Sequence, residues 1–154
     1  MIILAICLML LTSMPVMAST VEETLTPVSL EDLKWEDVTE ENNEDLWYLT
    51  RTICGEAQNC GLEESLYVGS VVLNRRDSDR FPNTIKEVVL DAGQYTCWTD
   101  GNAWKTPTEE NFEAAKQLLT EGSLFPPDIV WQSKAPQGTY TFLLSTWGHY
   151  YCGG

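Results

Sequence analysis

The sequence predicts an α+β domain in which three to four helices are followed by a C-terminal β-hairpin. Three observations support this prediction. Apolar residues recur at helical spacing over most of the chain, helix-capping residues stand at the starts of these segments, and β-branched and aromatic residues gather near the C-terminus. At 154 residues the chain has the length of one domain.

The first two helices are predicted over residues 42–58 and 63–76. In the first, "NNEDLWYLTRTICGEAQ", Asn43 can cap the start, acids occupy the first turn, and apolar residues fall on one side. Glu56 then lies at the C-terminal end of this helix. The second, "EESLYVGSVVLNRR", is apolar around most of its girth. A helix of that kind belongs in the middle of the domain.

Two further helices are predicted over residues 83–93 and 106–122. The later one, "TPTEENFEAAKQLLTEG", is expected to begin with a capping box of Thr106 and Glu109 and to end at Gly122.

The C-terminal part changes character after residue 128. The stretches "IVWQSK" and "TYTFLLSTWGHYYC" are rich in β-branched and aromatic residues, and "APQG" separates them. This pattern predicts two strands joined as a hairpin.

The first 45 residues are predicted to lie outside the folded domain. Residues 1–18 have a short apolar stretch followed by small residues, which is typical of a secretory signal peptide cleaved after Ala18. The first residues carry no Lys or Arg, so an uncleaved membrane anchor is the alternative. Residues 19–45 are interpreted as an acidic leader or linker with at most a short helix from Ser29, and residues 46–154 as the folded domain.

Acidic residues are concentrated in this leader. It holds ten acids and one base, which accounts for nine of the fourteen net negative charges. The chain has no basic face of the kind that binds nucleic acid, so nucleic-acid partners are not expected. Once the signal is removed, no membrane association is expected, and we expect a monomer.

Export changes the interpretation of the cysteines. Cys7 would leave with the signal peptide, and four cysteines would remain in an oxidising compartment. Three pairings are possible, and we favour one local bond and one bond that ties the C-terminus: Cys54–Cys60 and Cys97–Cys152. The alternative is four free buried thiols, which would suit a reducing cell.

Glu56 is the candidate catalytic acid. It lies between Gly55 and Ala57, on the expected core side of a helix, where small neighbours leave room for a ligand. A partly buried carboxyl has a raised pKa, so it stays protonated near neutral pH and can donate a proton. The simpler alternative is that Glu56 is one surface acid among many.

Five segments, in order, resemble the cell wall hydrolase family of the spore cortex-lytic enzymes, the SleB/CwlJ type. They are "RTICGEA", "VGSVVLNRR", "FPNTIKEVVL", "GQYTCW" and "WGHYYC", and they cover about residues 47–152. The last segment departs most from the family pattern, because Trp147 replaces a glycine and Cys152 replaces an aromatic residue.

The resemblance implies a lysozyme-like fold that acts on the glycan strands of peptidoglycan, with Glu56 as the catalytic glutamate. One carboxyl group is enough for a lytic transglycosylase, which closes an anhydro ring on the muramoyl sugar. Hydrolysis normally needs two carboxylates and is the competing outcome. Four acids in expected loops are candidates for the second: Asp77, Asp79, Asp91 and Asp100.

Four further residues are predicted to bind the substrate. Gln94, Tyr95 and Thr96 offer amide and hydroxyl groups that suit sugars, and His149 matches the family's near-terminal histidine. The alternatives are self-capping of the loop and a structural histidine. Because His149 is the only histidine, we expect no zinc site, and no cofactor is expected.

Two other functional classes stay open at this point. Cys97 and His149 could serve a cell-wall endopeptidase if the thiol were free and adjacent to the histidine. The domain could also be a non-catalytic glycan-binding module. In either case, we expect a secreted protein of the cell wall or spore cortex.

Overall fold

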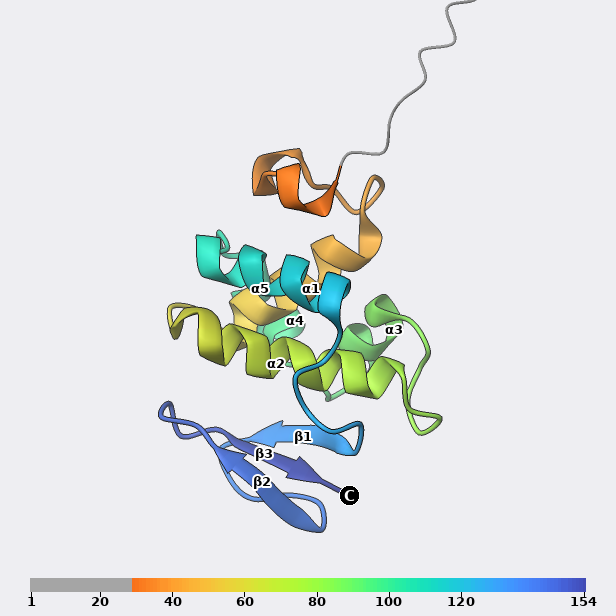
Figure 1. The fold of residues 1–154 in the computed structure, drawn as a ribbon, viewed down its shortest axis with the longest axis vertical. Coiled ribbons are helices and arrows are strands. Elements are labelled where there is room, and N and C mark those ends of the chain that lie inside the picture. The colour runs from red at the N-terminus through yellow and green to blue at the C-terminus, as the bar shows by residue number, and fades with distance from the viewer. Residues whose placement is uncertain (1–28) are drawn as a thin grey trace, which may run out of the picture.

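In the computed structural model, which describes residues 29–154, helix α2 (Gly61–Arg76) runs through the middle of the domain. It packs against α1 (Glu44–Ala57) and α5 (Glu109–Glu121) on one side and against strand β1 (Ile129–Ser133) on the other. Figure 1 shows these layers, with the helices stacked above α2 and the sheet below it. The predicted central helix is therefore confirmed.

The helix boundaries follow from local capping. Asn43 caps α1 by accepting a hydrogen bond from the backbone of Leu46, and Thr84 caps α3 (Ile85–Leu90). Helix α5 begins later than predicted, because its capping box is formed by Thr108 and Asn111 rather than by Thr106 and Glu109. Gly122 follows the last residue of α5, as predicted.

Two short elements were not predicted. Helix α4 (Cys97–Asp100) and the 3-10 helix η3 (Asn102–Trp104) follow each other and pack against α1. Each is too short to show a helical period in sequence. None of the helices between residues 29 and 154 combines the length and the apolar character that crossing a membrane requires.

The C-terminal sheet has three strands, and the predicted hairpin is wrong in its pairing. Strand β3 (Tyr150–Gly153) lies between β1 and β2 (Tyr140–Leu144) and pairs antiparallel with both. The expected second strand is in fact two strands, because a turn with Gly148 at φ 75° interrupts it. The hairpin therefore joins β2 to β3 and places the turn residues beside the end of α1.

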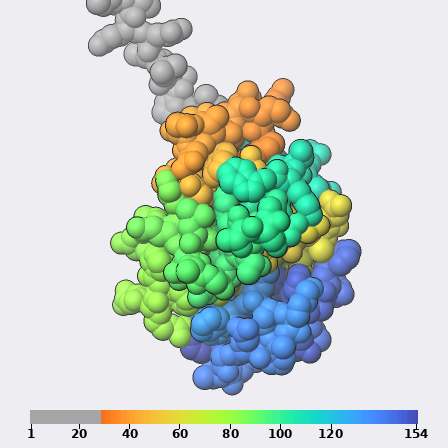
Figure 2. All heavy atoms as spheres, turned by 180° about the vertical axis from the view of Figure 1, so that it is seen from behind, coloured from red at the N-terminus to blue at the C-terminus, as the bar shows by residue number. Residues whose placement is uncertain are grey.

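Part of the predicted leader packs on the domain. The structure places residues 29–43 across α1 and α5, with two 3-10 helices at Leu30–Asp32 and Trp35–Asp37. Trp35 meets the ring of Phe112 edge-on at 5.9 Å, and Val38 is buried. This segment, orange in Figure 2, rests directly on the rest of the molecule. The predicted signal peptide and residues 19–28 of the leader lie outside the described residues.

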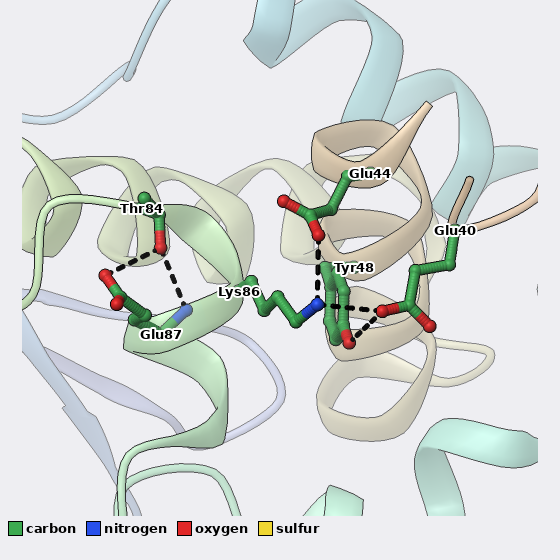
Figure 3. A network of polar contacts seen from close by, with 6 residues as sticks. All are labelled: Glu40, Glu44, Tyr48, Thr84, Lys86 and Glu87. Carbon is green, nitrogen blue, oxygen red and sulfur yellow. Dashed lines mark hydrogen bonds and ion pairs between the residues drawn. The ribbon is translucent and has the colours of Figure 1, made fainter. Parts of the chain in front are cut away.

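Charged side chains also join this segment to the domain. Lys86 on α3 places its Nζ 2.9 Å from a carboxylate oxygen of Glu40 and 3.0 Å from one of Glu44, and the Tyr48 hydroxyl donates to Glu40 (Figure 3). All of these charged groups are partly exposed to solvent. Ion pairs between exposed side chains contribute little to stability, so the apolar contacts of Trp35 and Val38 dominate the attachment.

Candidate active site

Gly55 allows α4 to approach the end of α1. A Cβ atom at this position would lie 2.5 Å from the Cβ of Cys97 and 3.1 Å from the backbone nitrogen of Ala103. Only glycine leaves room for that contact. The glycine before Glu56 therefore has a steric role, because it lets Cys97 pack beside the end of α1 that carries Glu56.

The turn after Glu56 fixes where α1 ends. Gln58 adopts φ 45°, in the left-handed region, and its N–H donates to the carbonyl of Cys54 at 3.0 Å. The N–H of Cys60 donates to the carbonyl of Ala57 at 2.9 Å and closes the turn before α2 begins. Glu56 is thereby held one residue before the end of α1.

A cleft of about 570 Å³ opens beside this turn. Its walls come from the end of α1, from α4 and η3, and from the two loops at the near end of the sheet. The side chains with polar or aromatic groups that line it are Glu56, Gln58, Asn59, Cys60, Thr96, Cys97, Asp100, Asn102, Lys134, Trp147 and His149.

Burial sets the protonation of Glu56. Removal from water raises the pKa of its carboxyl above the ordinary value, and the negative charge of Asp100 adds to this rise. Hydrogen bonds from Cys97 and the proximity of His149 act in the opposite direction, but the pKa of Glu56 is still raised. Glu56 therefore keeps its proton to a higher pH than an exposed glutamate would, which is what a general acid requires.

The sequence of the domain matches a known family in this region. Residues 61–128 match the family model described as Cell Wall Hydrolase. Over this segment the chain is similar to the cell wall hydrolases. Glu56 itself precedes the matched segment, so this match does not include it.

Two curated proteins that are similar to this chain are both named spore cortex-lytic enzyme. The one from Oceanobacillus iheyensis is 30% identical over 75 residues, and the one from Bacillus subtilis strain 168 is 32% identical over 78 residues. These alignments cover 49% and 51% of the chain, but only 27% and 26% of the relatives. The chain thus matches about a quarter of each relative's length.

Solved structures show the same fold. The catalytic domain of the Bacillus cereus SleB protein matches with a TM-score of 0.56 at 22% identity, over 70% of this chain and 88% of that one. The catalytic domain of the germination-specific lytic transglycosylase SleB from Bacillus anthracis matches with a TM-score of 0.58 at 21% identity, over 75% and 99%. The predicted lysozyme-like α+β class is confirmed.

The predicted site residues fall into two groups, those that line the cleft and those that do not. Thr96 and His149 line the cleft together with Glu56. Gln94 lies outside the lining and accepts a hydrogen bond from Arg75 at 3.0 Å. Tyr95 is buried, its hydroxyl has no hydrogen-bond partner within residues 29–154, and burial raises its pKa to about 12.

The structure departs from the predicted disulfides. Cys54, Cys60, Cys97 and Cys152 are all free thiols. The sulfur of Cys54 faces the carbonyl of Lys105 at 3.8 Å, and that of Cys152 faces the hydroxyl of Thr141 at 3.7 Å. Each thiol has its own local neighbours, so the structure contains neither Cys54–Cys60 nor Cys97–Cys152.

Sequence reasoning missed three residues at or below the cleft. Lys134, which follows β1, lines the cleft and reaches the carbonyl of Trp147 at 3.4 Å. Asn102 enters from η3, which was not predicted. Glu64 lies beneath the cleft, fully buried on α2. The sequence held a signal for Glu64. It stands four residues before Val68, and therefore on the same face of a helix that is expected to be buried.

The described residues offer no arranged metal site. Between residues 29 and 154, no group of three or more histidine, cysteine, aspartate or glutamate side chains could hold a metal ion.

Proposed function

We propose that this protein is an enzyme that cleaves the glycan strands of peptidoglycan, with Glu56 as its general acid. The observation that carries the proposal is a carboxyl group, with its pKa raised by burial, in the wall of an open cleft. The matched relatives named spore cortex-lytic enzyme support this substrate class.

The cleft suits a glycosidic bond in its chemistry. Glu56 would donate its proton to the oxygen between N-acetylmuramic acid and N-acetylglucosamine, and that bond would then break. The carboxylate so formed would take the proton of the muramoyl 6-hydroxyl, whose oxygen closes the anhydro ring. The proton balance is complete with one carboxyl group, so we propose a lytic transglycosylase.

Hydrolysis is the competing outcome, because the cleft lining holds a second acid. Asp100 lines the cleft, and its carboxylate accepts the backbone N–H of Asn102 at 2.9 Å. If Asp100 activated a water molecule, the product would carry a reducing end instead of an anhydro ring. Of the four acids considered from the sequence, Asp100 is the one among the residues that line the cleft.

The endopeptidase alternative requires a reactive thiolate at Cys97. Burial, together with the neighbouring Glu56, raises the pKa of this thiol instead of lowering it. A nucleophilic cysteine needs a lowered pKa or an adjacent base, so this environment favours Cys97 as a hydrogen-bond donor to Glu56.

Mass spectrometry of the fragments released from purified peptidoglycan tests the proposal. We expect anhydro-muramoyl ends from the wild type, and a loss of about 10²- to 10⁴-fold in rate for Glu56→Gln. Glu110→Gln changes an exposed glutamate of α5 outside the cleft and is the matched control, expected to keep full activity.

Other outcomes would each point to a different reading. Reducing ends that disappear in Asp100→Asn indicate hydrolysis with two acids. Cut peptides that disappear in Cys97→Ser indicate the endopeptidase. Binding to peptidoglycan without any released fragment indicates a glycan-binding module.

We also propose that the protein acts outside the cell, at the cell wall or spore cortex, as a monomer and without a cofactor. The apolar segment over residues 1–18 and the polymeric substrate support export. N-terminal sequencing of the mature protein tests it, with Ser19 as the expected first residue.

A further inference from the structure

Glu64 is a buried carboxyl group that the proposed reaction does not use. It lies in the first turn of α2 with 1% of its surface exposed. Its Oε1 accepts a hydrogen bond from the Tyr151 hydroxyl at 2.8 Å and also contacts Nδ1 of His149. A buried carboxyl is costly in free energy unless it is paired, so this cluster is a built arrangement and not a chance burial.

His149 joins this buried cluster to the cleft. The side chain of His149 lines the cleft that holds Glu56, while its Nδ1 points to Glu64 on the core side. No hydrogen bond within residues 29–154 involves the second ring nitrogen, Nε2, and Nε2 is not among the buried atoms without a partner. This nitrogen is therefore accessible on the cleft side.

The backbone around His149 is held as firmly as its ring. Its N–H donates to the hydroxyl of Ser145 at 3.3 Å, and its carbonyl accepts from the N–H of Ser145 at 2.9 Å. The N–H of Gly148 donates to the carbonyl of Ser145 at 3.0 Å and closes the turn. Since both ends of the residue are fixed, contact with Glu64 determines how the ring is rotated.

A carboxyl at Nδ1 also selects the tautomer of the ring. When Nδ1–H donates to Glu64, the neutral imidazole carries its lone pair on Nε2. That nitrogen can then accept a hydrogen bond from a hydroxyl in the cleft. Without Glu64, the proton could move to Nε2 and the same position would become a donor.

We propose that Glu64 is a positioning residue, which holds His149 so that Nε2 accepts a hydrogen bond from a sugar hydroxyl beside Glu56. The inference rests on the proposed function for its substrate. His149 would contact the glycan, whereas Glu64 would act only through His149.

The surrounding charges are compatible with this role. The titratable and charged groups that face His149, or line the cleft around it, come from every element packed there: Glu56, Cys60, Glu64, Cys97, Asp100, Lys134 and Tyr151. Lys134 is the one lysine or arginine in the lining. No other side chain within residues 29–154 bonds to the histidine ring, so Glu64 alone fixes it.

Nuclear magnetic resonance gives a direct test, because His149 is the only histidine in the chain. With ¹⁵N-labelled histidine, we expect the two ring nitrogens of the wild type to show a protonated Nδ1 and an unprotonated Nε2 when the ring is neutral. A wild-type ring with its proton on Nε2, or an equal mixture of tautomers, overturns the proposal. This measurement needs no variant and no substrate, so it stands apart from any failure of the proposed function.

A kinetic cycle provides the second test. We expect Glu64→Gln to lower kcat by about 10- to 100-fold with little change in KM, which is typical when an orienting partner is lost. If Glu64 acts only through His149, adding Glu64→Gln to His149→Gln should cause no further loss. Full additivity of the two losses overturns the proposal.

Tyr151→Phe is the matched control. It removes the other hydrogen bond to Glu64 but leaves the contact with His149 in place. We expect a lower melting temperature with the wild-type tautomer and kcat largely retained. If Tyr151→Phe lowers kcat as much as Glu64→Gln does, the cluster has only a structural role and the proposal fails.

Discussion

The two walls of the cleft are built in different ways. The helical wall, from α1 and α4, is closely packed, and its Gly55 leaves no space for even a methyl group beside Cys97. The sheet wall is open, with Trp147 53% exposed at its rim. The tight wall removes Glu56 from water and so raises its pKa, while the open wall leaves room for a polymer.

The two walls also hold the side chains of Glu56 and His149 in place in different ways. Glu56 is fixed by helix geometry and by contact with a second helix. His149 stands in a short turn and is fixed from below by Glu64, which belongs to α2. A turn can thus hold a side chain as firmly as a helix when a buried partner is supplied from a neighbouring element.

The largest effect is expected from disturbing the tight wall. Gly55→Ala places a methyl group against Cys97, so α4 must move away from Glu56. Overpacking of this kind costs about 1 to 3 kcal/mol of stability, and a displacement near 1 Å can lower the rate by about 100-fold. The measurements are thermal unfolding and the rate of peptidoglycan cleavage.

Gly69→Ala separates displacement from loss of stability. Its methyl group would meet Leu118 and Ile53 in the core between α2, α5 and α1, away from the cleft. We expect a comparable loss of stability with cleavage retained at a temperature where both variants are folded. Equal loss of cleavage in both variants would contradict the special role of the tight wall.

A smaller effect is expected on the open wall. Trp147→Ala removes an aromatic face from the rim, and stacking of this kind contributes about 0.5 to 1.5 kcal/mol. We therefore expect KM for soluble glycan fragments to rise by about 2- to 10-fold with little change in kcat. Leu144→Ala is the control, since Leu144 is also 53% exposed, on the strand before the turn, but does not line the cleft. A fall in kcat without a change in KM would place Trp147 in the reaction instead of in binding.

The helical wall was easier to predict from the sequence than the sheet wall. The periodic pattern located α1 and α2 and put Glu56 at a helix end, because caps and apolar spacing are local signals. The order of the three strands is not local. Gly148 is compatible with the turn before β3, but nothing in the sequence indicated that β3 would pair with both β1 and β2.

For the candidate site too, residues marked by local sequence signals were predicted and a contact between distant residues was not. Glu56, Thr96 and His149 were named from the sequence and line the cleft, but Glu64 was passed over. Its partner His149 stands 85 positions further along the chain, so only the fold brings the two together. Gln94 and Tyr95 were assigned to the cleft because amide and hydroxyl groups suit sugars. In the structure, Gln94 bonds to Arg75 and Tyr95 is buried in the core.

The smallest predicted change concerns the pH dependence set by the helical wall. In the proposed reaction Glu56 must be protonated to act as an acid, so we expect the rate to fall as pH rises through its pKa. Cys97 hydrogen-bonds to Glu56 and lowers this pKa, but a thiol is a weak donor. In Cys97→Ser, the stronger hydroxyl donor should stabilise the carboxylate further, lower the pKa of Glu56 and move the falling limb of kcat/KM to lower pH.

Stability should change in the same sense. Because burial raises the pKa of Glu56 in the folded state, the stability that its protonated form contributes is present at low pH. That contribution is lost as pH rises through the raised pKa, and Cys97→Ser should make the loss smaller. Cys54→Ser, which alters a buried thiol that faces Lys105 instead, should leave the pH profile of kcat/KM unmoved. A limb that moves upward in Cys97→Ser, or moves equally in both variants, would mean that Cys97 does not set the proton affinity of Glu56.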